Sequence, residues 1–100
     1  MSATHYLYLI VPPRETFVFD ASEDEMAIME RHADYVMAAR DAGLVLMAGP
    51  TMDGAYGASV LCTTDAASAE QYARNDPAVS SGLMTFRLHP WRASIRAVGL

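Results

Sequence analysis

The stretch from His5 to Val11, HYLYLIV, restricts the fold most, because it is predicted to be a β-strand that is apolar on both faces. Its aromatic and β-branched residues favour a strand, and Pro12 and Pro13 end it. Successive side chains of a strand point to opposite faces. Both sets are apolar here: Tyr6, Tyr8 and Ile10 on one face, and Leu7, Leu9 and Val11 on the other. A sheet built on such a strand needs a cover on each side.

A long helix is predicted from Ser22 to about Ala42. Ser22 with Glu25 three positions later forms a capping box, and the acidic residues that follow Ser22 suit a helix N-terminus. Gly43 is the expected stop. The preceding segment, residues 14–20, is predicted to be a loop that carries an apolar pair, Phe17 and Phe19.

The remaining elements follow from turn and breaker residues. Strands are predicted at residues 44–50, 58–64 and 82–91, and a second helix begins near Asp65 and stops before Pro77. The order βαββαβ predicts an α+β, ferredoxin-like fold: a four-stranded antiparallel sheet with both helices on one face. We expect residues 1–100 to form a single domain.

The free face of this sheet indicates self-association. Two helices can cover only one face, so a second chain must supply the other cover, and we expect a homodimer. The alternative is a monomer with some exposed apolar residues. Which face of the first strand meets the partner stays open at this point.

Composition narrows the function. Twelve acidic residues against seven basic ones give a net charge of −5, which disfavours nucleic acid as a partner. Cys62 is the only cysteine, so an internal disulfide and a cysteine-based metal cluster are excluded, and a reducing, cytoplasmic location is expected. The N-terminus lacks a signal-peptide pattern, and no apolar run reaches the roughly 20 residues of a spanning helix, so no membrane partner is expected.

His32 lies in an unusual position on the long helix. At about 100° per residue, the predicted core stripe contains Met26, Met29, Ala33, Val36, Met37 and Arg40. A separate, charged arc contains Glu30, Arg31, Asp34 and Asp41. His32 falls inside an apolar arc about 200° wide. An arc of this width touches more than one surface, so we expect His32 at a seam. A buried histidine satisfied by one hydrogen bond is the alternative.

Several segments together resemble the YCII-related family of the dimeric α/β-barrel superfamily. They are HYLYLIVPPRETF, MAIMERHADYV, AGLVLMAGP, YGASVL, NDPAVSSGL and FRLHPW, and they follow the family order over nearly the whole chain. In that family a histidine of the first long helix and an aspartate are proposed as a catalytic dyad. The resemblance assigns the histidine to His32 and the aspartate to Asp76 of NDPAV.

Asp34 is the competing acid. Residues two apart on a helix point to different sides, so Asp34 should face solvent while His32 faces inward. Asp76, at the end of the second helix, could hold one ring nitrogen and leave the other for proton transfer. A simple Asp-Pro turn is the alternative for Asp76.

Further ligand-binding candidates are weaker. Arg14, beside two prolines and Phe17, could present its guanidinium to a small anion. Tyr35 and Tyr56 could donate hydrogen bonds, and His89 shares a strand face with Arg87. Two histidines without a third ligand do not predict a metal site, and no cofactor motif is present. Cys62 is expected to be a packed thiol rather than a nucleophile.

Two function classes remain. The first is a dimeric enzyme that uses His32 and Asp76 for isomerase, lyase or dehalogenase-like acid/base chemistry on a small, anionic organic molecule. The second is a non-catalytic ligand-binding or regulatory module, because this fold serves both purposes. An RNA-binding sheet would require basic surroundings, and this chain is acidic.

Overall fold

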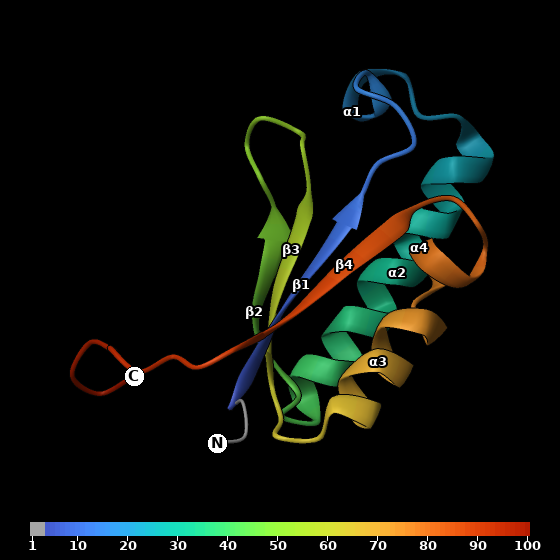
Figure 1. Ribbon diagram of the computed structural model, residues 1–100. Coiled ribbons are helices and arrows are strands. Elements are labelled where there is room, and N and C mark those ends of the chain that lie inside the picture. The colour runs from blue at the N-terminus through green and yellow to red at the C-terminus, as the bar shows by residue number, and fades with distance from the viewer. Residues whose placement is uncertain (1–3) are drawn as a thin grey trace.

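The computed structural model describes residues 4–100 and contains the predicted βαββαβ order (Figure 1). The first three residues of the expected domain lie outside the described part. The strands are β1 (His5–Val11), β2 (Val45–Pro50), β3 (Gly57–Cys62) and β4 (Thr85–Trp91). The longer helices are α2 (Glu23–Asp41) and α3 (Ala66–Asn75), and two single-turn helices are α1 (Phe17–Asp20) and α4 (Pro77–Ser80).

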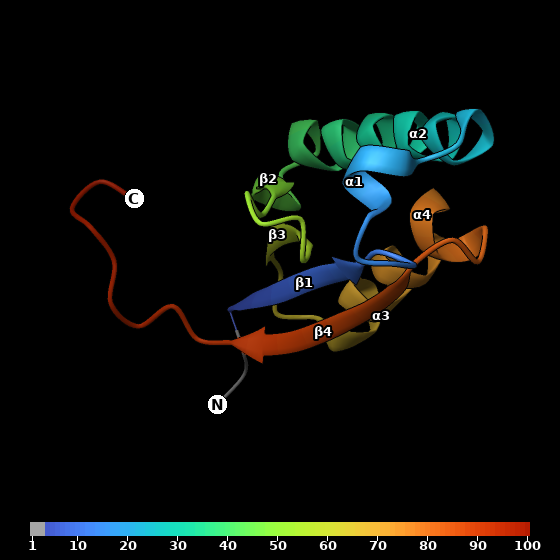
Figure 2. The ribbon, with the colours of Figure 1, turned by 90° about the horizontal axis from the view of Figure 1, so that it is seen from above.

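The four strands form one sheet in the order β2-β3-β1-β4, and every neighbouring pair is antiparallel. Figures 1 and 2 place α2, α3 and α4 on the same side of this sheet. The predicted α+β, ferredoxin-like fold is therefore confirmed. Within residues 4–100, no helix covers the opposite face.

The two faces of β1 differ in burial as this arrangement requires. Tyr6, Tyr8 and Ile10 are buried under the helices, with 6%, 1% and 3% of their surface exposed. The alternate residues Leu7, Leu9 and Val11 are only partly buried. Leu7, Leu9 and Val11 thus form a more exposed apolar surface than the residues under the helices.

The ends of α2 agree with the sequence. The Ser22 hydroxyl accepts a hydrogen bond from the Glu25 backbone N–H, and the Glu25 carboxylate accepts one from the Ser22 N–H, so the capping box is confirmed. The helix ends at Asp41, and Gly43 follows with a φ of +86°, a backbone conformation that favours glycine. None of the helices in the described part of the chain has the length and apolar character needed to cross a bilayer.

Two local predictions are corrected. The predicted loop at residues 14–20 contains α1, which separates the apolar pair: Phe17 is 7% exposed and Phe19 is 90% exposed. The last strand begins at Thr85 rather than at residue 82, because α4 and a turn occupy the chain after Pro77.

The position of α2 also differs from the prediction. Its stripe of methionine, alanine and valine was expected to pack into the core, but no residue of α2 is buried. Met26 and Met37 are 57% and 43% exposed, and Met29 and Val36 are only partly buried. The core lies mainly between the sheet, α3 and α4, and Met29 and Val36 of α2 only pack against it. It includes Tyr8, Leu61, Ala69, Tyr72, Ala73 and Ala78.

Candidate functional site

His32 and Asp76 meet although 44 positions separate them in the chain. His32 lies in the middle of α2, and Asp76 lies at the junction between α3 and α4. The Nδ1 atom of His32 is 2.8 Å from Asp76 Oδ1 and 2.9 Å from Oδ2. The Asp76 side chain is fully buried, whereas 18% of the His32 side chain is exposed. One residue of the pair is thus inaccessible and the other reaches the surface of a cavity.

Two further groups hold the Asp76 carboxylate. The hydroxyl of Tyr8 donates a 2.7 Å hydrogen bond to Oδ2, and the backbone N–H of Ala78 donates a 2.9 Å bond to Oδ1. Burial, together with the hydrogen bond to Asp76, raises the pKa of Tyr8 well above its ordinary value, so its hydroxyl remains a donor.

The carboxylate of Asp76 determines the tautomer of His32. A carboxylate only accepts hydrogen bonds, so Nδ1 of His32 carries the ring proton and donates the hydrogen bond to Asp76. In the neutral ring, Nε2 then keeps its lone pair. Nε2 has no hydrogen-bond partner within residues 4–100. The arrangement can therefore accept a proton at Nε2 and return it.

The Asp-Pro sequence explains why Asp76 lies where it does. A residue before proline favours an extended backbone, and Asp76 has φ −59° and ψ 126°, which ends α3. Pro77 then begins α4, and Asp76 caps that helix through its bond from Ala78. The turn expected from the sequence and the contact with His32 are thus both present. Asp34, the competing acid, is exposed on α2.

A cavity of about 590 Å³ lies between α2 and the sheet, next to His32. This volume is within the range of small-molecule sites, roughly 300 to 1,000 Å³. Apolar side chains form most of its wall. They include Ile10, Phe17, Met26, Met29, Val36 and Met84. The polar side chains that line it are Tyr8, His32, Tyr56 and Ser59.

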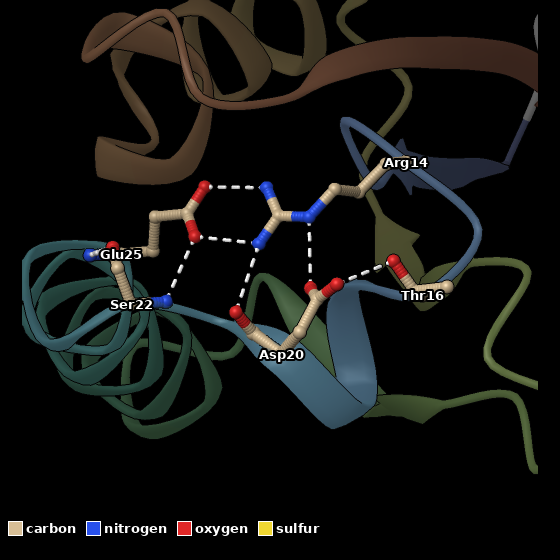
Figure 3. Close-up of polar contacts among 5 residues, drawn as sticks. All are labelled: Arg14, Thr16, Asp20, Ser22 and Glu25. Atoms are coloured by element: carbon tan, nitrogen blue, oxygen red, sulfur yellow. Dashed lines mark hydrogen bonds and ion pairs between the residues drawn. The ribbon is translucent and has the colours of Figure 1, made fainter.

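Arg14 lies outside this cavity and is bound by carboxylates of its own chain (Figure 3). Its guanidinium donates two bonds to Glu25, at 2.9 and 2.8 Å, and a 2.8 Å bond to Asp20. It also lies 5.4 Å above the centre of the Phe17 ring. These bonds, that to Glu25 first, raise the pKa of Arg14. The bond from Arg14, followed by that from the Ser22 N–H, lowers the pKa of Glu25 to about 2. The cluster fastens α1 to the start of α2.

The other candidates are dispersed. Tyr56 lines the cavity, whereas Tyr35 stacks on Tyr72 at 4.8 Å between ring centres and donates to the Tyr72 carbonyl oxygen at 2.7 Å. Burial, followed by the charge of Asp76, raises the pKa of Tyr35.

His89 is exposed on β4 beside Leu7, on the helix-free face, so the sheet separates it from His32. Cys62 was expected to be a packed thiol but is exposed. Among the described residues, no group of three or more His, Cys, Asp and Glu side chains could hold a metal ion.

Sequence reasoning did not assign Tyr8 and Ser59 to the site. Both line the cavity from the helix-covered face of the sheet. The alternation of β1 placed Tyr8 on one apolar face without indicating a polar partner for its hydroxyl. A tyrosine in a buried strand usually needs such a partner, and that is the signal that could have identified it.

The fold and this site define a ferredoxin-like α+β protein with a histidine–aspartate pair beside an apolar cavity. The sequence profile of the family described as YCII-related domain matches residues 5–92, and the chain belongs to this family. A comparison with curated proteins found no match.

Proposed function

We propose that this protein is a small dimeric enzyme in which His32 is the general acid and base and Asp76 is its positioning residue. The substrate is a small organic molecule bound in the cavity next to His32. The observation that carries this proposal is the 2.8 Å contact between Nδ1 of His32 and a fully buried carboxylate. A histidine held only for packing has a hydrogen-bond partner too, but His32 also lines the cavity, and its Nε2 atom has no partner within residues 4–100.

The proposed chemistry is proton transfer. Nε2 of His32 removes a proton from a substrate carbon next to a carbonyl group, and the electron pair of the broken C–H bond moves onto the carbonyl oxygen as an enolate. The imidazolium that forms is stabilised by Asp76 through Nδ1–H. Return of the proton to another carbon isomerises the substrate, whereas loss of a leaving group from the adjacent carbon completes an elimination. Both outcomes need the same two residues.

Deuterium exchange tests this step without knowledge of the natural substrate. A panel of small ketones and lactones is incubated with the protein in D₂O, and uptake of deuterium next to the carbonyl is followed by NMR. We expect at least one compound to exchange faster with the protein than without it. His32→Gln should abolish the acceleration, and Asp76→Asn should reduce it about 10²- to 10⁴-fold, because the ring loses its fixed tautomer.

Asp34→Asn is the matched control. It makes the same chemical change two residues from His32, at an exposed position, and should leave exchange unaltered. Unchanged exchange in His32→Gln would contradict the proposal. An equal loss in Asp34→Asn and Asp76→Asn would remove the specific role of Asp76.

The assembly is part of the proposal. The helix-free face of the sheet carries Leu7, Leu9 and Val60, with register partners on adjacent strands. We propose that two copies of this one-domain chain bury these faces against each other. The single cysteine suits a reducing compartment and supports a cytoplasmic location.

A non-catalytic binding module is the second candidate. It is favoured by the cavity, which offers few polar groups for chemistry besides His32. Binding of panel compounds without exchange would support this function over the enzyme.

A further inference from the structure

We infer that the cavity selects neutral, largely apolar ring compounds with one carbonyl or hydroxyl group, and discriminates against carboxylates. This inference rests on the proposed function and specifies its substrate class. It departs from the anionic ligand expected from the sequence, which depended on Arg14.

The charges around the cavity carry the inference. All seven basic residues of the chain are arginines, and none of them lines the cavity. Arg14, the expected anion ligand, already has two carboxylate partners. An anion that enters the cavity would lose part of its water shell and gain no cation other than His32.

His32 cannot serve as a free cation, because Asp76 lies 2.8 Å behind it. When the ring is protonated, the pair has no net charge. When the ring is neutral, the pair carries the negative charge of Asp76. In the first state the carboxylate behind the ring offsets most of the attraction of the ring for an anion, and in the second state the pair repels an anion. A neutral ligand is affected by neither charge in this way.

The wall chemistry indicates the shape of the ligand. Four methionines line the cavity: Met26, Met29, Met37 and Met84. Thioethers adapt to irregular shapes and make favourable contacts with aromatic rings. Phe17 adds an aromatic surface, and the cavity of about 590 Å³ is large enough for one or two rings. A single polar group on such a ligand would meet His32 or Ser59.

A matched pair of ligands tests the inference. The neutral fluorescent probe N-phenyl-1-naphthylamine is bound to the wild-type protein at pH 7 and displaced with 2-naphthamide or 2-naphthoate. These compounds share the ring system and differ in charge. We expect 2-naphthamide to compete at a concentration at least tenfold lower than 2-naphthoate. Equal competition, a preference for 2-naphthoate, or no competition by either compound would overturn the inference.

A charge inserted into the wall locates the binding. Met29→Lys should narrow or reverse the preference, because it gives 2-naphthoate a cation inside the cavity. Met52→Lys, at a fully exposed position of the β2–β3 loop, should not change it. Circular dichroism verifies that both variants are folded, and the wild-type comparison stands without them.

The two proposals fail separately. The displacement assay requires no turnover, so a preference for 2-naphthoate would reject the substrate class and leave the exchange experiment valid. Binding of 2-naphthamide without exchange of any panel ketone would reject the catalytic role of His32 and keep the ligand class.

Discussion

The hydroxyl of Tyr8 donates a 2.7 Å hydrogen bond to Asp76 across 68 positions of the chain. The neighbouring Tyr72 packs edge-on against Tyr8, with 5.7 Å between ring centres. Unlike Tyr8, its buried hydroxyl has no partner within the described residues. Replacing each tyrosine with phenylalanine therefore removes a bonded hydroxyl in one case and an unbonded hydroxyl in the other.

Tyr8→Phe should lower the free energy of unfolding by about 1.5 to 3 kcal/mol, because a buried carboxylate loses a donor. Tyr72→Phe should leave it unchanged or raise it by up to about 1 kcal/mol, because an unsatisfied hydroxyl is removed. Urea denaturation measures both values. Equal destabilisation by the two variants would show that the hydrogen bond to Asp76 does not contribute to the free energy of unfolding.

Alkaline pH should unfold the protein through its buried tyrosines. Burial first, and then the negative charge of Asp76, raise the pKa of Tyr72, and burial with the Asp76 hydrogen bond raises that of Tyr8. The folded state thus holds these protons more tightly than the unfolded state. The resulting stabilisation is complete below pH 10 and is lost as the pH rises above it.

Absorbance at 295 nm should show these two tyrosines ionising only together with loss of the circular dichroism signal. Tyr8→Phe and Tyr72→Phe should each reduce the amplitude of that cooperative step. Ionisation of all tyrosines before any unfolding would contradict this expectation.

Acid should weaken the cluster around Arg14. The hydrogen bond from Arg14, followed by that from the Ser22 N–H, lowers the pKa of Glu25 from 4.5 to about 2. A lowered pKa means that the stabilisation is complete above pH 4.5 and is lost as the pH falls toward 2. Thermal melting of Glu25→Gln should therefore show a flatter pH dependence across this interval. Arg14→Met should flatten it in the same way, and an unaltered slope in both variants would exclude the pair as its source.

Charge on the free sheet face should prevent self-association. Leu9→Asp places a carboxylate between Ala58 and Arg87 on that face. Light scattering after gel filtration should give about twice the chain mass of 10.9 kDa for the wild type and the single chain mass for this variant. Met52→Asp, in the exposed β2–β3 loop, should remain dimeric. A wild-type protein that stays monomeric at high concentration would reject the dimer.

The sequence was sufficient where local chemistry determines the structure. Ser22, Glu25 and Gly43 specify both ends of α2 through capping bonds and a left-handed backbone, and these interactions involve only near neighbours. The alternation of side chains along β1 likewise assigned its residues to two faces, and this required no knowledge of the neighbouring strands. The contact between His32 and Asp76 was reached from the helix angle of His32 and from family resemblance.

The sequence pattern did not predict the exposure of α2 or the hydrogen-bond partners of Tyr8 and Arg14. These features depend on how far apart the elements lie, which periodicity does not give. Helical periodicity gives the angle of Met26 and Met37 around α2, but not the separation between the helix and the sheet. A stripe that lines a cavity has the same period as one that fills a core. Hydropathy treats Tyr8 as an apolar strand residue, so the pattern gave no sign of its bond to Asp76. The carboxylate partners of Arg14, Asp20 and Glu25, lie across a turn and a helix cap, so the sequence pattern gave no sign that its guanidinium is already bound.

The separation of α2 from the sheet has a consequence for how this scaffold can change. Met26 is 57% exposed, and Met29 and Val36 pack against the core without being fully buried, so substitutions there disturb the core less than substitutions at a fully buried position. Such substitutions should lower the free energy of unfolding only slightly, whereas they change the shape and chemistry of the cavity wall directly. Asp76 and Tyr8 are fully buried and lie on other elements than α2, so we expect them to stay in place. A protein built this way can acquire a new ligand preference by mutation along one helix, without first acquiring extra stability elsewhere.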